Sequence, residues 1–180
     1  MPGRSWTLFA TSWGILTASI VATAAVQGPR LGRPATPEEV HAVDMSIPPD
    51  GAGLPPGEGT SQQGETIYRR QCAACHGDKG EGGTNDRLVG GIGTLTSARP
   101  IKTVGSYWQW PTTLFDYTRR AMPYGAPLSL TADETYALTA YMLYLNGIIE
   151  ETDAMNADTL PNVTMPNRDG FINAYPQRPQ

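Results

Sequence analysis

The sequence predicts an all-α fold of three to four helices, flanked by extended N- and C-terminal arms. Helix-capping residues precede its main apolar segments, and no segment predicts a strand. The 180 residues include 20 glycines and 16 prolines, so much of the chain is expected in turns and extended segments. The helical unit is therefore expected to be small, over residues 62–150, and a unit of this size often needs a prosthetic group.

Residues 1–25 predict a signal peptide. No charged residue lies between Trp6 and Val26, and the triplet "ATA" at 22–24 satisfies the small-x-small rule for cleavage after export. An uncleaved membrane anchor is the alternative, because 21 uncharged residues can just span a bilayer. In both cases the rest of the chain is expected to be exported, and it meets a membrane only if the anchor is retained.

Two arms flank the expected helical unit. Residues 26–61 form a Pro- and Gly-rich arm, in which "TPEEVHAV" predicts a short helix with Thr36 as N-cap and Glu39 completing a capping box. Residues 151–180 form an extended C-terminal tail. Both arms carry spaced apolar residues, which we expect to lie along a partner rather than to fold back on a small domain. These residues are Leu31, Val40, Ile47, Leu54, Leu160, Val163, Phe171 and Ile172.

Two helices are predicted in the first part of the central unit from residues that begin or end a helix. One is capped by Thr60 or Ser61 and runs to about Gln71, and another covers "TTLFDYTRRA" and stops before Pro123. A glycine-rich loop, "GDKGEGGTNDRLVGGIG", lies between them. The order helix, long loop, helix is therefore expected before the last helix begins.

The strongest helix signal is "LTADETYALTAYMLYLNGII". Thr131 and Glu134 form a capping box, and Asn146 with Gly147 supplies a stop. Apolar residues recur at helical spacing, which predicts one buried stripe. The stripe consists of Ala137, Ala140, Tyr141, Tyr144, Leu145 and Ile148.

Both cysteines and one of the two histidines fall within "CAACH" at residues 72–76. Cys-x-x-Cys-His is the attachment signature of c-type haem. Residues three apart share a face of a helical turn, so Cys72 and Cys75 can bond one edge of the porphyrin while His76 supplies an iron ligand. The motif predicts one haem c, bound covalently through the two cysteines.

Other uses of the two cysteines fit the motif less well. A redox-active Cys-x-x-Cys is expected after a strand, whereas a helix leads into this motif. A structural zinc site needs four ligands, which would require His41 from the arm beside Cys72, Cys75 and His76. A disulfide leaves His76 without a role.

Met122 is predicted to be the second axial ligand. It stands at a helix end before a proline and can approach the haem from the face opposite His76. Met165, also followed by proline, is the main alternative, whereas Met142 lies inside the last helix as packing material and His41 lies in the arm. With both axial positions filled, the iron is expected to exchange single electrons and to bind no substrate.

Four further residues are candidates for binding the haem propionates: Trp108, Trp110, Arg119 and Arg120. Core packing is the competing interpretation for the tryptophans, and a solvated helix face is the competing interpretation for the arginines. Lys102 is expected to be exposed. The net charge of −4 and the lack of a basic run argue against nucleic-acid binding.

Several of these features together resemble a class I cytochrome c. They are Gly64 and Tyr68 ahead of "CAACH", "MP" at 122–123, and "LTADETYALTAYMLYL", and the resemblance covers residues 62–150. It implies the class I cytochrome c fold, in which three to four helices surround one covalently bound haem. It also implies that the first and last helices cross where Gly64 and Tyr68 meet Tyr141.

A narrower resemblance covers roughly residues 32–173. It is carried by "LGRPATPEEV", "PPDGAGLPPGEGT", "CHGDKGEGG", "LVGGIGTL", "KTVGSYW", "TLFDYTRRAMP" and "MPNRDGF". These segments are similar to the cytochrome subunit of Sox-type sulfane dehydrogenases and related sulfite dehydrogenases. This implies a periplasmic partner subunit with a molybdenum cofactor, which oxidises a sulfur compound and passes electrons to the haem. The chain differs from the two-haem form of that subunit in having a single Cys-x-x-Cys-His.

The sequence therefore predicts a periplasmic, single-haem cytochrome that is the electron-transfer subunit of an oxidoreductase complex rather than a catalyst itself. A downstream cytochrome c or terminal oxidase would accept its electrons. A free periplasmic electron shuttle is the first alternative, for which residues 62–150 would suffice. A haem enzyme or gas sensor with an open sixth position is the second, and it predicts that Met122 is not bound.

Overall fold

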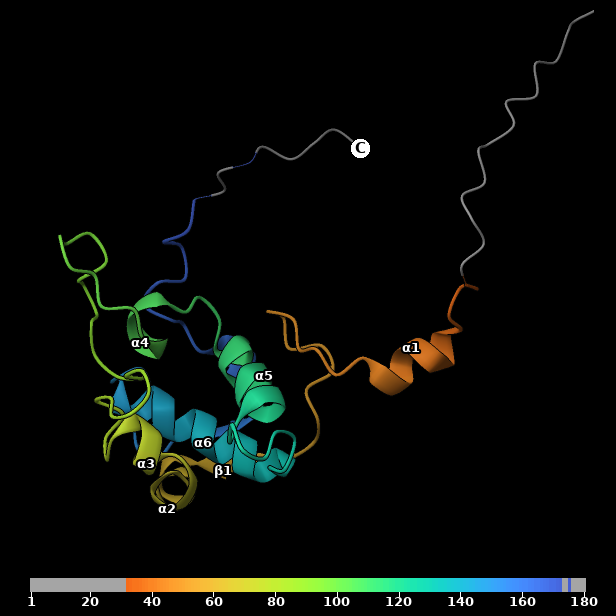
Figure 1. Cartoon of the computed structure of the whole chain (residues 1–180), viewed down its shortest axis with the longest axis horizontal. Coiled ribbons are helices and arrows are strands. Elements are labelled where there is room, and N and C mark those ends of the chain that lie inside the picture. Colours follow the sequence, from red (N-terminus) through yellow and green to blue (C-terminus); the bar gives the residue numbers. More distant parts are fainter. Residues whose placement is uncertain (1–31, 173–174, 176–180) are drawn as a thin grey trace, which may run out of the picture. The chain divides into compact units, whose positions relative to one another are not determined.

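The computed structural model describes residues 32–172 and residue 175, and its regular structure is mostly helical (Figure 1). The described elements are α1 (Pro37–Val43), β1 (Glu58–Thr60), α2 (Ser61–Gln71), α3 (Ala73–His76), α4 (Val104–Tyr107), α5 (Pro111–Ala121), α6 (Ala132–Leu145), β2 (Ala154–Asn156) and the 3-10 helix η1 (Leu160–Asn162). The predicted signal peptide or anchor lies outside the described residues. Within the described part of the chain, no helix is both long enough and apolar enough to cross a membrane.

The chain divides into two units, and the first ends at Val40. Its described part contains the predicted capping box: the Glu39 backbone N–H donates to Thr36 Oγ1 at 3.3 Å, and the Thr36 N–H donates to Glu39 Oε2 at 2.9 Å. Arg33 forms an ion pair with the same carboxylate. All three side chains are exposed, so local bonds rather than burial hold this helix start.

The second unit, His41–Gln180, contains the motif helices. Capping boxes start α2, through Thr60 and Gln63, and α6, through Thr131 and Glu134. Both starts lie where the sequence predicts them. The helices α3 and α4 have four residues each, and a single turn is too short to show apolar periodicity in the sequence.

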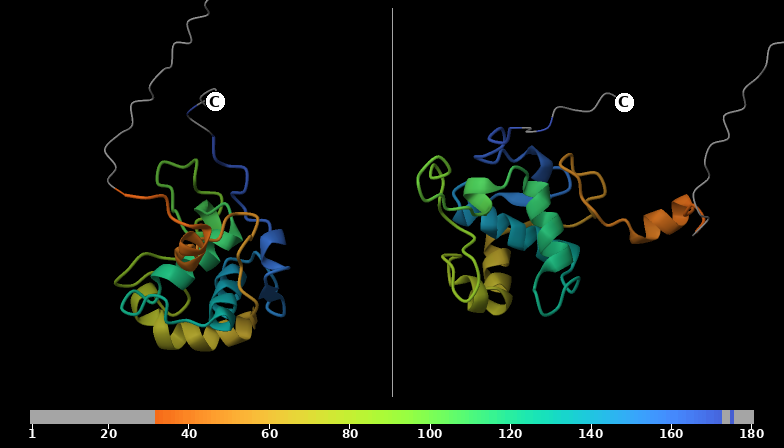
Figure 2. Two further views of the ribbon diagram at one scale, coloured as in Figure 1. Left: turned by 90° about the vertical axis from the view of Figure 1, so that its right-hand side faces the viewer. Right: turned by 45° about the horizontal axis from the view of Figure 1, so that its top comes forward.

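The first and last long helices of this unit, α2 and α6, pack directly on each other, as the left view of Figure 2 shows. A Cβ added to Gly64 would lie 1.9 Å from the Ala137 carbonyl oxygen, so only glycine allows this approach. One turn later the rings of Tyr68 and Tyr141 meet with centroids 5.3 Å apart. The predicted crossing at Gly64, Tyr68 and Tyr141 is confirmed.

The helix α6 is buried on more than one face. All nine residues from Thr135 to Leu143 are buried, whereas Tyr144 is 36% exposed, so the prediction of a single stripe that includes Tyr144 is wrong. The hydroxyls of Thr135 and Thr139 donate to the carbonyls one turn earlier, at 2.8 and 2.7 Å, which allows polar residues inside the core. The helix is buried on more than one face because α2, α5, β1 and β2 all contact it.

Two strands of three residues each pair antiparallel, with Gly59 opposite Met155. The prediction that the chain has no strand is wrong for this reason. Three residues are too few for an alternating pattern, and the pairing joins segments on either side of the helical unit. Met155 is 4% exposed, so β2 brings an apolar side chain into the core.

Apolar residues of both arms also enter the hydrophobic core. Ile47 is 6% exposed and Leu160 is 0% exposed, while Leu54 and Val163 are half-buried against the same cluster. The expectation that these arm residues lie free for a partner is wrong, since η1, which contains Leu160, packs on α5, and the Ile47 N–H donates to Asp116 of the same helix.

The remaining apolar arm residues stay accessible. Val40, Phe171 and Ile172 are 48%, 46% and 92% exposed. Leu31 lies outside the described residues. These apolar side chains of the described arms are therefore available to a partner.

Candidate haem site

The motif "CAACH" forms one helical turn directly after α2. The backbone N–H groups of Cys75 and His76 both donate to the Cys72 carbonyl, at 3.1 and 3.0 Å. This turn places Cys72 and Cys75 one turn apart, and neither forms a disulfide. Two thiols and an imidazole are thus presented from one short segment.

The two thiols differ in their surroundings. Cys75 is exposed and Cys72 is half-buried. Burial, with a smaller effect of neighbouring Cys75, raises the pKa of Cys72 to about 11. The Cys72 sulfur is therefore a neutral thiol near pH 7, which argues against a reactive thiolate at this position.

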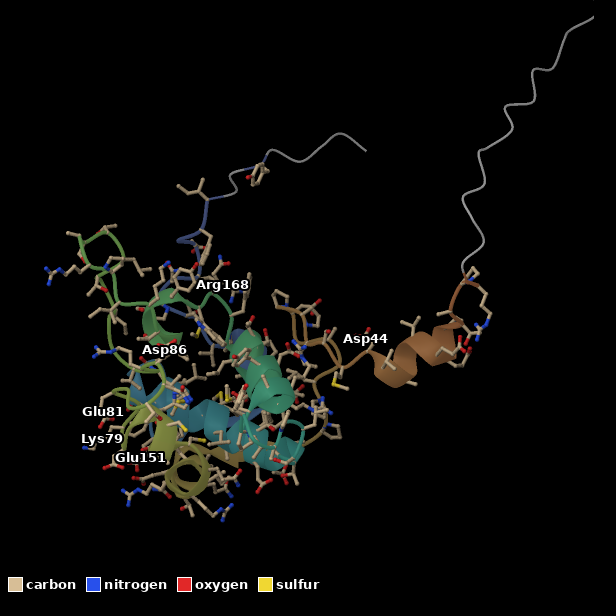
Figure 3. The ribbon with its side chains drawn as sticks, viewed as in Figure 1. Asp44, Lys79, Glu81, Asp86, Glu151 and Arg168 are labelled. Atoms are coloured by element: carbon tan, nitrogen blue, oxygen red, sulfur yellow. The ribbon has the colours of Figure 1, made fainter. Side chains whose placement is uncertain are left out.

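His76 is oriented by a backbone carbonyl. Its Nδ1 lies 2.7 Å from the carbonyl oxygen of Asp86, a residue on the loop that follows α3 and is labelled in Figure 3. A carbonyl oxygen only accepts, so Nδ1 must carry the proton, and the lone pair of Nε2 remains available for a metal. Asp86 has no signal in the sequence, because its contribution comes from the main chain.

The loop after α3 is fixed by main-chain bonds on both sides of Asp86. Ahead of it, the Asn85 N–H donates to the Cys75 carbonyl at 2.9 Å. Beyond it, the N–H groups of Leu88 and Val89 both donate to the Gly80 carbonyl, at 2.8 and 3.0 Å. The acceptor of the His76 proton is therefore part of a fixed turn.

Met122 is the C-cap of α5, with its N–H bonded to the Thr118 carbonyl at 3.1 Å and its side chain half-buried. Met142, Met155 and Met165 are 5%, 4% and 1% exposed and belong to the packed core. The side chain of His41 lies outside the described residues. Among the methionines named here, Met122 is the one that is not enclosed by core packing.

The site residues fit a c-type haem. Two free thiols stand one turn apart, and the adjacent histidine has one ring nitrogen committed to a carbonyl and the other available. The chemistry of this donor set is the thioether and imidazole ligation that haem c requires.

Comparison with known proteins agrees with this geometry. Residues 59–142 match a family model described as cytochrome C oxidase, cbb3-type, subunit III. The fold is similar to the crystal structure of the sulfane dehydrogenase SoxCD from Paracoccus pantotrophus, with 44% identity and a TM-score of 0.73, covering 82% of this chain and 71% of that one. A sequence search of curated proteins finds no match. The chain is a class I c-type cytochrome.

As a member of this family, the cytochrome transfers electrons and uses haem c. The resemblance to the Sox-type cytochrome subunit that the sequence predicts is likewise confirmed by the 44% identity to SoxCD. The family model includes only residues 59–61 of the N-terminal arm and none of the C-terminal tail, whereas the SoxCD match extends beyond it.

The candidate propionate ligands of the cytochrome have partners within the chain. The Trp110 ring is covered by the Arg168 guanidinium at 3.4 Å, and the Trp108 ring meets Tyr117 edge-on at 5.7 Å. These contacts support the packing interpretation of the tryptophans.

The two candidate arginines lie on α5. Arg120 forms an ion pair with Asp116, which raises the pKa of Arg120 above its ordinary value. Arg119 is half-buried. Lys102 is exposed as expected, and its ammonium lies 4.9 Å from the centre of the Tyr107 ring.

Proposed function

We propose that this cytochrome carries a single haem, bound covalently by Cys72 and Cys75, with His76 and Met122 as axial ligands. We further propose that it is the electron-accepting subunit of a periplasmic, molybdenum-dependent dehydrogenase of sulfur compounds such as sulfite or a sulfane. The observation that supports a molybdenum-containing partner subunit is the 44% identity to SoxCD over 82% of the chain. That share is about 148 of 180 residues, so the likeness includes parts of the arms as well as the region 59–142.

The residues of the chain have separate tasks in this function. Cys72 and Cys75 hold the group in place, and the Asp86 carbonyl fixes the ring of His76. When bound, haem c supplies a reversible one-electron couple of iron. With His76 and Met122 filling both axial positions, no site is left for substrate, which favours electron transfer over catalysis at this centre.

The position of Met122 supports it as the sixth ligand. A ligand needs a side chain that can reach a bound group, and the half-buried Met122 at the end of α5 meets this condition. The alternative, Met165, is 1% exposed and packed in the core cluster, so its use would require opening that core.

A dedicated partner is supported by the exposed ends of the arms. Val40 and Val43 on α1 are 48% and 73% exposed, and they lie in a segment that a free shuttle would not need. A partner subunit that covers such side chains would gain apolar burial. After reduction, a cytochrome c or a terminal oxidase would remove the electron.

The test is anaerobic reduction of the purified holoprotein by sulfite or thiosulfate in the presence of the molybdenum subunit. The haem is expected to become reduced only with both components, and a small reductant serves as the positive control. A haem that responds to the small reductant but never to the sulfur compound would contradict the partner and leave the electron-transfer role intact.

A second arm of this experiment uses Val43→Asp, with Ile92→Asp as the matched control at a 51% exposed apolar position outside the arms. The arm variant should keep its haem spectrum and bind the molybdenum subunit more weakly than the wild type. Equal losses of binding in both variants would show that the arm has no special part in docking.

A further inference from the structure

The side chain of Asn146, the C-cap of α6, lies buried between this helix and the loop that follows α3. It is 8% exposed. Its Nδ2 group donates to the Leu88 carbonyl at 3.2 Å and to the Met142 carbonyl at 2.9 Å, and its Oδ1 accepts from the Gly90 N–H at 3.2 Å. One amide therefore joins the end of α6 to two positions of the loop.

These loop positions follow closely after Asp86, whose carbonyl holds the His76 ring. Leu88 is fixed on its other side by Gly80, and Gly90 is also bonded through its carbonyl to Thr103 Oγ1 at 2.6 Å. Peptide units are planar and stiff, so anchoring Leu88 and Gly90 restricts where the Asp86 carbonyl can point.

The approach of α4 leaves room for this amide. A Cβ added to Gly105 would lie 2.3 Å from Asn146 Oδ1 and 2.6 Å from its Cγ, which is closer than atoms can approach. The structure thus contains a space for the Asn146 side chain that only glycine at position 105 provides.

We infer that Asn146 is a positioning residue for the haem ligand His76. It holds the segment Leu88–Gly90, which in turn holds the Asp86 carbonyl against Nδ1 of His76. The inference rests on the proposed role of His76 as an axial ligand. It adds a residue distant in the sequence to those that fix the orientation of the His76 ring.

The physical consequence concerns the strength of the His76–Asp86 hydrogen bond. This bond increases the basicity of the imidazole, which favours ferric over ferrous iron. Without the amide of Asn146 the loop keeps its main-chain bonds but loses its link to α6, so the Asp86 carbonyl is held less tightly. The hydrogen bond to His76 then weakens, the Nδ1 proton exchanges faster with solvent, and the reduction potential rises.

The test compares Asn146→Ala with Leu143→Val in the holoprotein. Leu143 is 0% exposed in the same helix, so this control loosens the core while the Asn146 amide and its hydrogen bonds stay in place. Two quantities are measured: the exchange rate of the His76 Nδ1–H by NMR in the reduced protein, and the reduction potential. Asn146→Ala should speed the exchange about tenfold and raise the potential, because a lost buried hydrogen bond has effects of that order.

Gly105→Ala provides an independent variant, because it displaces the amide from the α4 side and leaves Asn146 in place. It should change both quantities in the same direction as Asn146→Ala. The inference is overturned if Asn146→Ala and Gly105→Ala differ from Leu143→Val in neither quantity. If exchange accelerates while the potential stays constant, Asn146 positions the loop and His76 is not the ligand. In that case His76→Ala should keep the wild-type haem spectrum.

Discussion

The segments that carry His76 and Met122 are held in place by different kinds of contact. Around His76, main-chain bonds between residues 72 and 90 fix the turn and its loop. Met122 stands at the end of α5, and this helix is held by side chains that reach distant parts of the chain. Asp116 accepts from the Ile47 N–H at 3.2 Å, and the Phe115 ring lies 4.5 Å from the Tyr136 ring.

The His76 side of the site is therefore held by contacts within one short segment, and the Met122 side by contacts between segments far apart in the sequence. Many main-chain bonds support the His76 side, so the loss of one side chain there leaves most of them in place. The Met122 side depends on a small number of long-range contacts, among them one from the N-terminal arm. Substitutions at the two sides should therefore have unequal effects.

The largest effect is expected at the two cysteines. In Cys72→Ala with Cys75→Ala both thioether bonds are lost, so acidified organic solvent should extract all of the haem. The wild-type haem should stay on the chain after the same treatment. Haem that is extractable from the wild type would contradict covalent attachment on the His76 side.

Met122→Ala should have the next largest effect. The reduction potential should fall by roughly 0.1 V, within the range of about 0.8 V that axial ligands span, because the thioether favours ferrous iron. Carbon monoxide should also bind rapidly to the reduced protein. Met165→Leu is the control, since it removes a sulfur from the core at nearly constant volume. If this control behaves like Met122→Ala instead, the sixth ligand is Met165.

The same contrast accounts for what the sequence could predict. Cys72, Cys75 and His76 form one local motif, and its spacing alone predicts covalent haem attachment and an iron ligand. Met122 could only be selected from several methionines by its place at a helix end, and Asp86 could not be found because a carbonyl has no sequence signal.

The fold shows a similar division. The starts of α2 and α6 were predictable from capping residues within four positions. The pairing of β1 with β2 and the burial of Ile47 and Leu160 depend on contacts between segments far apart in sequence, for which no local pattern exists.

Asp116→Ala tests the long-range support of the Met122 side. Asp116 is 8% exposed and binds both the Ile47 N–H and the Arg120 guanidinium, so its removal should lower the free energy of unfolding by about 2 kcal/mol. Asp116→Asn keeps an acceptor for Ile47 and should lose less. Chemical denaturation of the holoprotein measures both. Equal losses in the two variants would show that the arm contact contributes nothing.

The smallest effect is expected from Tyr68→Phe on the His76 side. The Tyr68 hydroxyl donates to the Gly77 carbonyl at 2.8 Å, and burial raises its pKa above the ordinary value, so it remains a donor near neutral pH. Its ring packs on Tyr141 in either variant, and the main-chain bonds of the loop are untouched. The loss should therefore be that of one hydrogen bond, about 1 kcal/mol in the free energy of unfolding, with little change in the reduction potential. Chemical denaturation and potentiometry of the holoprotein measure the two quantities. A loss as large as that of Asp116→Ala would mean that the His76 side relies on single side chains as much as the Met122 side does.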